Sequence, residues 1–148
     1  MEERIISGRG THERTAVTSA QMKEIERRAD EAGLSYYQMM ENAGTGAAEY
    51  IASEHSAAGK TVLIFCGKGN NGGDGFVGSK AAVYALDIPS GLNGDTGEAD
   101  EDAVQAGCTI AFHRLKPAHL MEKCAVFCGK TVCLSIGIDD VPGQDVLG

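Results

Sequence analysis

The chain has 148 residues, of which 43% are hydrophobic and 23% charged, and its formal net charge is −8. This composition is typical of one soluble globular domain with a buried core. The negative charge argues against a protein that binds nucleic acid by neutralising phosphates. No apolar run is long enough to cross a bilayer. We therefore expect neither a nucleic-acid partner nor a membrane partner.

The first 17 residues carry charges of both signs and no apolar stretch of the kind that signal peptides have. We predict a disordered leader over residues 1–17, one domain over 18–139 and a tail without periodicity over 140–148.

Two helices are predicted next. The first begins at Thr18, whose spacing to Gln21 fits a capping box, and it ends at Gly33. Ser35 is placed to cap the second helix. The apolar positions of this second helix recur at helical spacing: Met40, Ala43, Ala47 and Ile51.

Short apolar runs predict strands over residues 61–66, 83–88, 109–112 and 131–138, and a short helix is predicted over 98–106. Strands that alternate with helices indicate an α/β fold with a parallel sheet.

The five cysteines form no C-x-x-C pair, and no histidine stands at zinc-like spacing from two of them. We interpret them as small core residues in a reducing, cytoplasmic protein. They are Cys66, Cys108, Cys124, Cys128 and Cys133.

A glycine-rich loop over residues 67–75 follows the strand 61–66, and it contains a G-x-G-x-x-G pattern. Such a loop after a buried strand favours ligand binding over a plain flexible turn. The side-chain oxygens of Asn70, Asn71 and Asp74 suit a hydroxylated ligand or a hard cation. The acidic ribose ligand of a dehydrogenase is missing at its usual spacing, which argues against an NAD-dependent oxidoreductase without excluding it.

Asp87 closes the strand 83–88. Open α/β sheets bind ligands at the carboxyl ends of their strands, so this aspartate is a candidate site residue. Its alternative role is to cap the following turn, Pro89-Ser90-Gly91.

Several motifs together resemble the YjeF N-terminal family. They cover nearly all of residues 18–139 and occur in the same order as in that family: Met40-Glu41-Asn42-Ala43-Gly44, Gly69-Asn70-Asn71-Gly72-Gly73-Asp74-Gly75, Leu86-Asp87-Ile88-Pro89-Ser90-Gly91-Leu92, Asp95-Thr96-Gly97, Leu115-Lys116-Pro117 and Ile136-Gly137-Ile138. The resemblance implies a Rossmann-like three-layer α-β-α sandwich and NAD(P)HX epimerase activity. This reaction interconverts the R and S forms of hydrated NADH and NADPH, so that an ADP- or ATP-dependent dehydratase can restore the cofactor.

The resemblance also implies roles for individual residues. Asp87 would contact the substrate and transfer the proton, and Asn71 and Ser90 would bind a potassium ion. The hydrated dinucleotide would be lined by Asn70, Asn71, Gly72, Gly73, Asp74 and Asp87.

One block of the family pattern is missing near residues 78–82. The glycine loop runs almost straight into the strand 83–88, although a parallel crossover needs a dozen or more residues. We therefore expect a domain that has lost central βα units. A non-catalytic binding or scaffold module, or an inactive fragment, stays an alternative to the epimerase. The dehydratase could be fused or separate, and the oligomeric state stays open, with a homodimer as one form.

Overall fold

The computed structural model describes residues 5–7, 16–55, 62–65 and 82–138. Its strands form one five-stranded sheet in the order β1-β5-β4-β3-β2, and every neighbouring pair is parallel. The strands are β1 (Ile5–Ser7), β2 (Val62–Phe65), β3 (Ala82–Leu86), β4 (Cys108–Phe112) and β5 (Lys130–Leu134). The predicted parallel sheet is confirmed.

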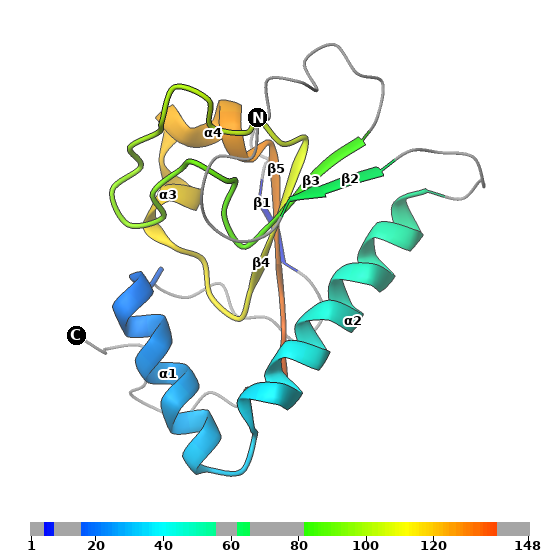
Figure 1. Cartoon of the computed structure of the whole chain (residues 1–148), viewed down its shortest axis with the longest axis vertical. Helices are drawn as coiled ribbons and strands as arrows, with labels where there is room; N and C mark the ends of the chain where they lie inside the picture. The colour runs from blue at the N-terminus through cyan, green and yellow to red at the C-terminus, as the bar shows by residue number, and fades with distance from the viewer. Residues whose placement is uncertain (1–4, 8–15, 56–61, 66–81, 139–148) are drawn as a thin grey trace.

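Helix α2 (Tyr36–Glu54) covers one face of this sheet (Figure 1). Its buried Ala47 packs with Tyr84 of β3, Ile110 of β4 and Val132 of β5. Because side chains alternate along a strand, the intervening residues point to the opposite face.

That opposite face is covered by three short helical segments, α3 (Pro117–Leu120), η3 (Glu122–Cys124) and α4 (Ala125–Cys128). The buried Thr109 of β4 donates from its hydroxyl to the Cys128 carbonyl oxygen at 2.7 Å. Helices therefore lie on both sides of the sheet, and the Rossmann-like three-layer arrangement is confirmed.

Helix α1 (Ser19–Glu31) begins as predicted, because Thr18 and Gln21 form the capping box. Its apolar face packs at the carboxyl end of the sheet, against Ile136 and Ile138 beyond β5. The chain leaves this helix through Gly33, whose φ of +114° is the left-handed conformation that favours glycine.

The core face of α2 differs from the predicted one by a single residue. Met40 is 72% exposed, whereas Met39 is buried and joins the cluster around α1. Met39, Ala43 and Ala47 recur every four residues and form the stripe toward the core.

The helix predicted over residues 98–106 is wrong. This segment instead runs beside the loop that follows β3, with Leu92 and Ala99 in an isolated antiparallel bridge. The amides of Asp100 and Val104 donate to carbonyl oxygens of that loop, each at 2.9 Å. These long-range bonds use donors that a helix would need. The strand predicted over 131–138 is shorter than expected and ends at Leu134.

The disordered leader is also wrong for the part of residues 1–17 that the structure describes. Residues 5–7 form strand β1, which pairs with β5, and Val17 is buried, with its amide donating to the Leu115 carbonyl oxygen at 2.8 Å. Two consecutive β-branched isoleucines favour a strand, and charge alone does not reveal this preference.

The described cysteines are buried, as expected for core residues, and form no disulfide with one another: Cys108, Cys124, Cys128 and Cys133. Burial raises the pKa of the Cys108 thiol to about 11, which keeps it protonated at neutral pH. Cys66 lies outside the described residues.

Strand β2 stands at one edge of the described sheet and pairs with β3 from Val62–Ala82 to Phe65–Ala85. The expected deletion near residues 78–82 and the glycine loop 67–75 lie in the connection between them, which is outside the described residues. None of the described helices has both the length and the apolar character that a membrane span requires.

Candidate functional site

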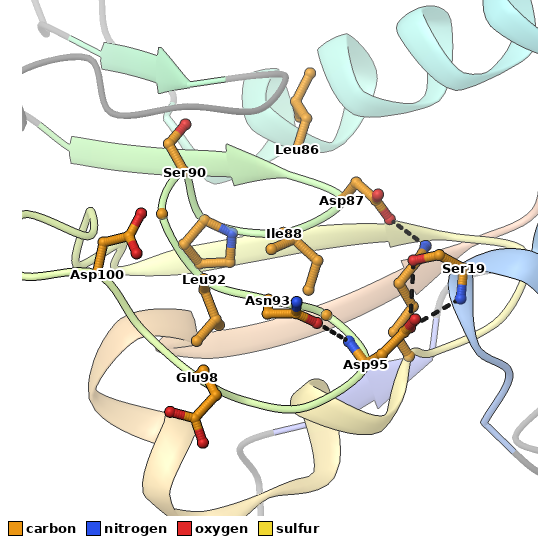
Figure 2. Close-up of a pocket in the computed structure, with 14 residues that line it drawn as sticks. Ser19, Leu86, Asp87, Ile88, Ser90, Leu92, Asn93, Asp95, Glu98 and Asp100 are labelled. Atoms are coloured by element: carbon orange, nitrogen blue, oxygen red, sulfur yellow. Dashed lines mark hydrogen bonds and ion pairs between the residues drawn. The ribbon is translucent and has the colours of Figure 1, made fainter.

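A cavity of about 580 Å³ lies at the carboxyl end of β3 (Figure 2). The segment 86–95 forms most of its wall, and Ser19 of α1 and Lys116 before α3 add to it. Its position is the one expected for a ligand site in an open parallel sheet.

The backbone of Asp87 has an unusual conformation at the mouth of this cavity. Its φ is +71°, in the left-handed region that few residues other than glycine adopt. Its amide donates to the Ile110 carbonyl oxygen at 2.7 Å, and its own carbonyl oxygen is 2.7 Å from Nε2 of His119. The backbone of Asp87 is therefore hydrogen-bonded to neighbouring elements through both its amide and its carbonyl oxygen.

The carboxylate of Asp87 pairs with Lys116. The Lys116 Nζ atom donates to Asp87 Oδ1 at 2.9 Å. The lysine side chain is only 9% exposed, whereas the aspartate side chain is 49% exposed. The cation is thus enclosed by protein, and the carboxylate faces the cavity, where a ligand can reach it.

Glu26 of α1 brings a second carboxyl group toward this pair. Burial raises its pKa above the ordinary value of 4.5. The nearby charge of Lys116 opposes this rise, and that of Asp87 adds to it. Three ionisable groups from separate elements therefore interact at one place.

The loop after Asp87 is fixed by its own polar side chains. Asn93 accepts hydrogen bonds from the amides of Asp95 and Thr96, at 2.8 and 3.0 Å. Asp95 in turn accepts from the amide and hydroxyl of Ser19, at 2.8 and 3.2 Å. A carboxylate at the start of α1 is stabilised by the helix dipole, so this contact joins the helix to the cavity wall.

Ser90 also lines the cavity, and it is only 2% exposed. Figure 2 shows it on the other side of the view from Asp87, with Ile88 between them. The structure thus brings two predicted site residues into one cavity. The other predicted site residues lie outside the described residues: Asn70, Asn71, Gly72, Gly73 and Asp74.

Three residues around Asp87 were not found by sequence reasoning: Lys116, His119 and Glu26. His119 is fully buried and contacts the site through the Asp87 carbonyl oxygen. A local signal was present, because Lys116-Pro117 followed by His119 has the N-cap, N1 and N3 spacing of a helix start. Glu26 carried no such signal.

The sequence also matches a family model described as the YjeF-related protein N-terminus, over residues 36–80 and 77–118. Together these two overlapping segments cover more than half of the chain.

Similar proteins include the bifunctional NAD(P)H-hydrate repair enzyme Nnr of Coxiella burnetii, 24% identical over 200 positions that cover 81% of this chain. The NAD(P)H-hydrate epimerase of Rhodopirellula baltica is 40% identical over 97 positions, which cover 57% of this chain. The Nnr of Moorella thermoacetica is 39% identical over 90 positions, which cover 53% of this chain. The matched regions span 41%, 39% and 17% of these proteins.

The alignment with the Coxiella protein is longer than this chain, 200 positions against 148 residues. A similar protein from Pyrobaculum aerophilum aligns over 210 positions. These relatives therefore contain residues, inside the aligned region, that have no counterpart here.

Proposed function

Because the chain belongs to the family described as the YjeF-related protein N-terminus, we propose that it is an isomerase-type domain that interconverts the R and S forms of hydrated NADH and NADPH. The names of its relatives support this substrate class. The observation that carries the proposal is the Asp87 carboxylate, half exposed in a cavity of about 580 Å³ and paired with an enclosed lysine.

Asp87 would act as the general acid and base. In one route, its protonated carboxyl group gives a proton to the C6 hydroxyl, which leaves as water. Water then returns to the other face of the ring and gives the proton back. In the other route, the carboxylate takes the hydroxyl proton as the C6–N1 bond breaks, which leaves an aldehyde at C6 and the bonding electron pair on N1, and the carboxyl group then gives the proton to N1. Attack of N1 on the opposite face of the aldehyde reverses these transfers and closes the ring. The position of Asp87 is compatible with both routes.

The remaining substrate contacts belong to the glycine loop in this proposal. Asn70, Asn71 and Asp74 would hold the dinucleotide together with the backbone of Gly72 and Gly73. Backbone amides in such loops suit phosphates.

A potassium ion would bind between Asn71 and Ser90 and supply a fixed positive charge beside the substrate. Amide, hydroxyl and carbonyl oxygens are suitable ligands for a hard cation. The buried place of Ser90 in the cavity wall fits this role. Among the described residues there is no cluster of histidine, cysteine or acidic side chains that would favour a transition metal instead.

The test of this function is the rate at which the purified chain interconverts the two hydrated epimers in the presence of potassium. We expect Asp87→Asn to lower this rate about 100-fold or more, because general acid–base catalysis contributes at least that much. The asparagine variant should stay folded, since asparagine tolerates a positive φ, although it loses the ion pair with the enclosed Lys116. Equal rates for wild type and variant would refute the role of Asp87.

A second candidate is a non-catalytic module or an inactive fragment, produced by an internal deletion near residues 78–82. The two overlapping family matches and the long alignments support a deletion. The test is a chimera that carries the Coxiella segment between residues 77 and 82. If the deleted block supplies part of the site, the chimera will gain epimerase activity over the parent chain. An equally active parent chain would refute this requirement.

For partners, we propose a dehydratase that uses the same hydrated cofactor, fused or separate, as the word bifunctional in the relatives' names supports. A homodimer is the proposed assembly. A cytoplasmic location is also proposed, because the described cysteines form no disulfide with one another and disulfides are rare in reducing compartments.

A further inference from the structure

The contacts between Asp87 and the segment 116–119 form a closed circuit. The Lys116 amide donates to Nδ1 of His119 at 2.8 Å. Nδ1 is therefore the bare nitrogen of a neutral ring, and Nε2 carries the hydrogen that it donates to the Asp87 carbonyl oxygen at 2.7 Å. The Lys116 side chain then returns to the carboxylate of the same aspartate at 2.9 Å.

This circuit joins Asp87 and Lys116, which are 29 positions apart, in two ways. Their backbones are linked through the His119 ring, and their side chains are linked by the ion pair. His119 is fully buried, and the Lys116 side chain is 9% exposed, so water does not compete freely for these bonds. The lysine stem also packs closely on Gly94, because a Cβ at Gly94 would lie only 3.0 Å from Lys116 Cδ.

The conformation of Asp87 explains why such a circuit is needed. A positive φ at a residue with a side chain costs free energy and persists where neighbouring groups hold it. His119 holds the carbonyl oxygen and Ile110 the amide, which aims the side chain at the cavity.

We propose that Lys116 and His119 are positioning residues for Asp87: His119 sets the backbone of the aspartate, and Lys116 sets the direction of its carboxylate. This inference deepens the proposed function and rests on it for its kinetic part. The structural part, the histidine tautomer and the Asp87 backbone, stands without it.

The structural test is NMR of the purified chain. The ¹⁵N shifts of the His119 ring should show a protonated Nε2 and a bare Nδ1. His119→Phe should move the Asp87 backbone shifts out of the positive-φ range, whereas His119→Gln, which keeps a donor near the position of Nε2, should restore them in part. The matched control is His55→Phe, which removes the 2.8 Å hydrogen bond to Tyr84 outside the cavity and should leave Asp87 unchanged. A His119 ring protonated at Nδ1 would overturn the circuit. If His119→Phe does not fold, this ring signal in the wild type decides alone.

The kinetic test compares the epimerisation rates of Lys116→Met and Lys116→Arg with the wild-type rate. The matched control is Lys130→Met, which removes a lysine–carboxylate pair of 3.1 Å outside the cavity. A misplaced catalytic group costs about 100-fold, so Lys116→Met should lower kcat by about that factor with little change in KM. Lys116→Arg should recover part of the loss. Equal kcat values for Lys116→Met and Lys130→Met would overturn the role of the lysine. If the wild-type chain does not epimerise, the proposed function fails for this chain, and the NMR test alone decides the positioning.

Discussion

Each end of the parallel strands has a lysine–carboxylate pair, and the two pairs serve different purposes. At the carboxyl end, Lys116 and Asp87 are 2.9 Å apart, with side-chain exposures of 9% and 49%. At the amino end of β5, Lys130 and Glu54 are 3.1 Å apart, with exposures of 34% and 38%. In the first pair the lysine is enclosed by protein and the aspartate is exposed. In the second pair the two side chains are about equally exposed, and the pair joins β5 to α2.

The contrast shows how a binding pair differs from a structural one. A ligand needs access to one partner only, and the other partner serves best when protein holds it. At the amino end, Lys130 also lies 5.6 Å from the centre of the Tyr50 ring. Its contacts therefore fasten β5 to α2, outside the cavity that Asp87 lines.

We expect the largest loss of stability from Gly129→Ala, a substitution at the amino end of the strands. Gly129 has a φ of +62°, and an added Cβ would lie 2.4 Å from the Gly107 carbonyl oxygen and 2.5 Å from that of Ala106. Backbone atoms cannot move aside easily, so overpacking and strain should together cost about 3 kcal/mol or more. Urea unfolding measures this loss, and a cost below about 1 kcal/mol would contradict the geometry.

Gly97→Ala should have a smaller effect, at the carboxyl end. Its φ is +79°, but the nearest atoms to an added Cβ belong to side chains, with Met121 Sδ at 2.5 Å and Lys123 Cε at 3.0 Å. Methionine is flexible and can repack, so we expect a cost of about 1–3 kcal/mol. A cost equal to that of Gly129→Ala in the same urea series would contradict this, because it would show that the side chains around Gly97 cannot repack.

Glu26→Gln tests the electrostatics of the cavity. Burial raises the pKa of Glu26 above its ordinary 4.5, so between 4.5 and the raised pKa the folded state holds more protons than the unfolded state. The contribution of Glu26 to stability therefore falls as pH rises through this window. Glutamine does not titrate, so the difference in melting temperature, variant minus wild type, should increase with pH across it. A difference that is flat or decreases with pH would contradict the raised pKa.

The smallest effect should come from Lys130→Met. Both partners of the Lys130–Glu54 pair are more than one-third exposed, and such pairs contribute about 1 kcal/mol or less. Chemical unfolding should show a loss within this limit. A loss of several kcal/mol would mean that the amino-end pair carries more of the stability than its exposure indicates.

Sequence reasoning was most successful where the determinants are local. Thr18 and Gln21 are three residues apart and define the start of α1. The buried strands were found because a parallel strand covered on both faces is apolar throughout. Asp87 was found by the same route, since a ligand site follows the end of such a strand.

The failures all involve partners that are distant in the sequence. Lys116 and His119 meet Asp87 across 29 and 32 positions, and only the topology of the sheet brings them together. The segment 98–106 has residues that suit a helix, but two of its amides donate instead to carbonyl oxygens of residues 90 and 91. In α2, Met39 and Met40 are both apolar, and periodicity alone chose the wrong one for the core.

The left-handed backbone at position 87 restricts which amino acids can stand there. Glycine and asparagine suit the backbone but lack the carboxylate, and glutamate has the carboxylate but a poorer tolerance of positive φ. Aspartate alone meets both requirements. A chain under selection for this site therefore has no neutral replacement at position 87. Any substitution there loses either the carboxylate or the backbone conformation of the loop.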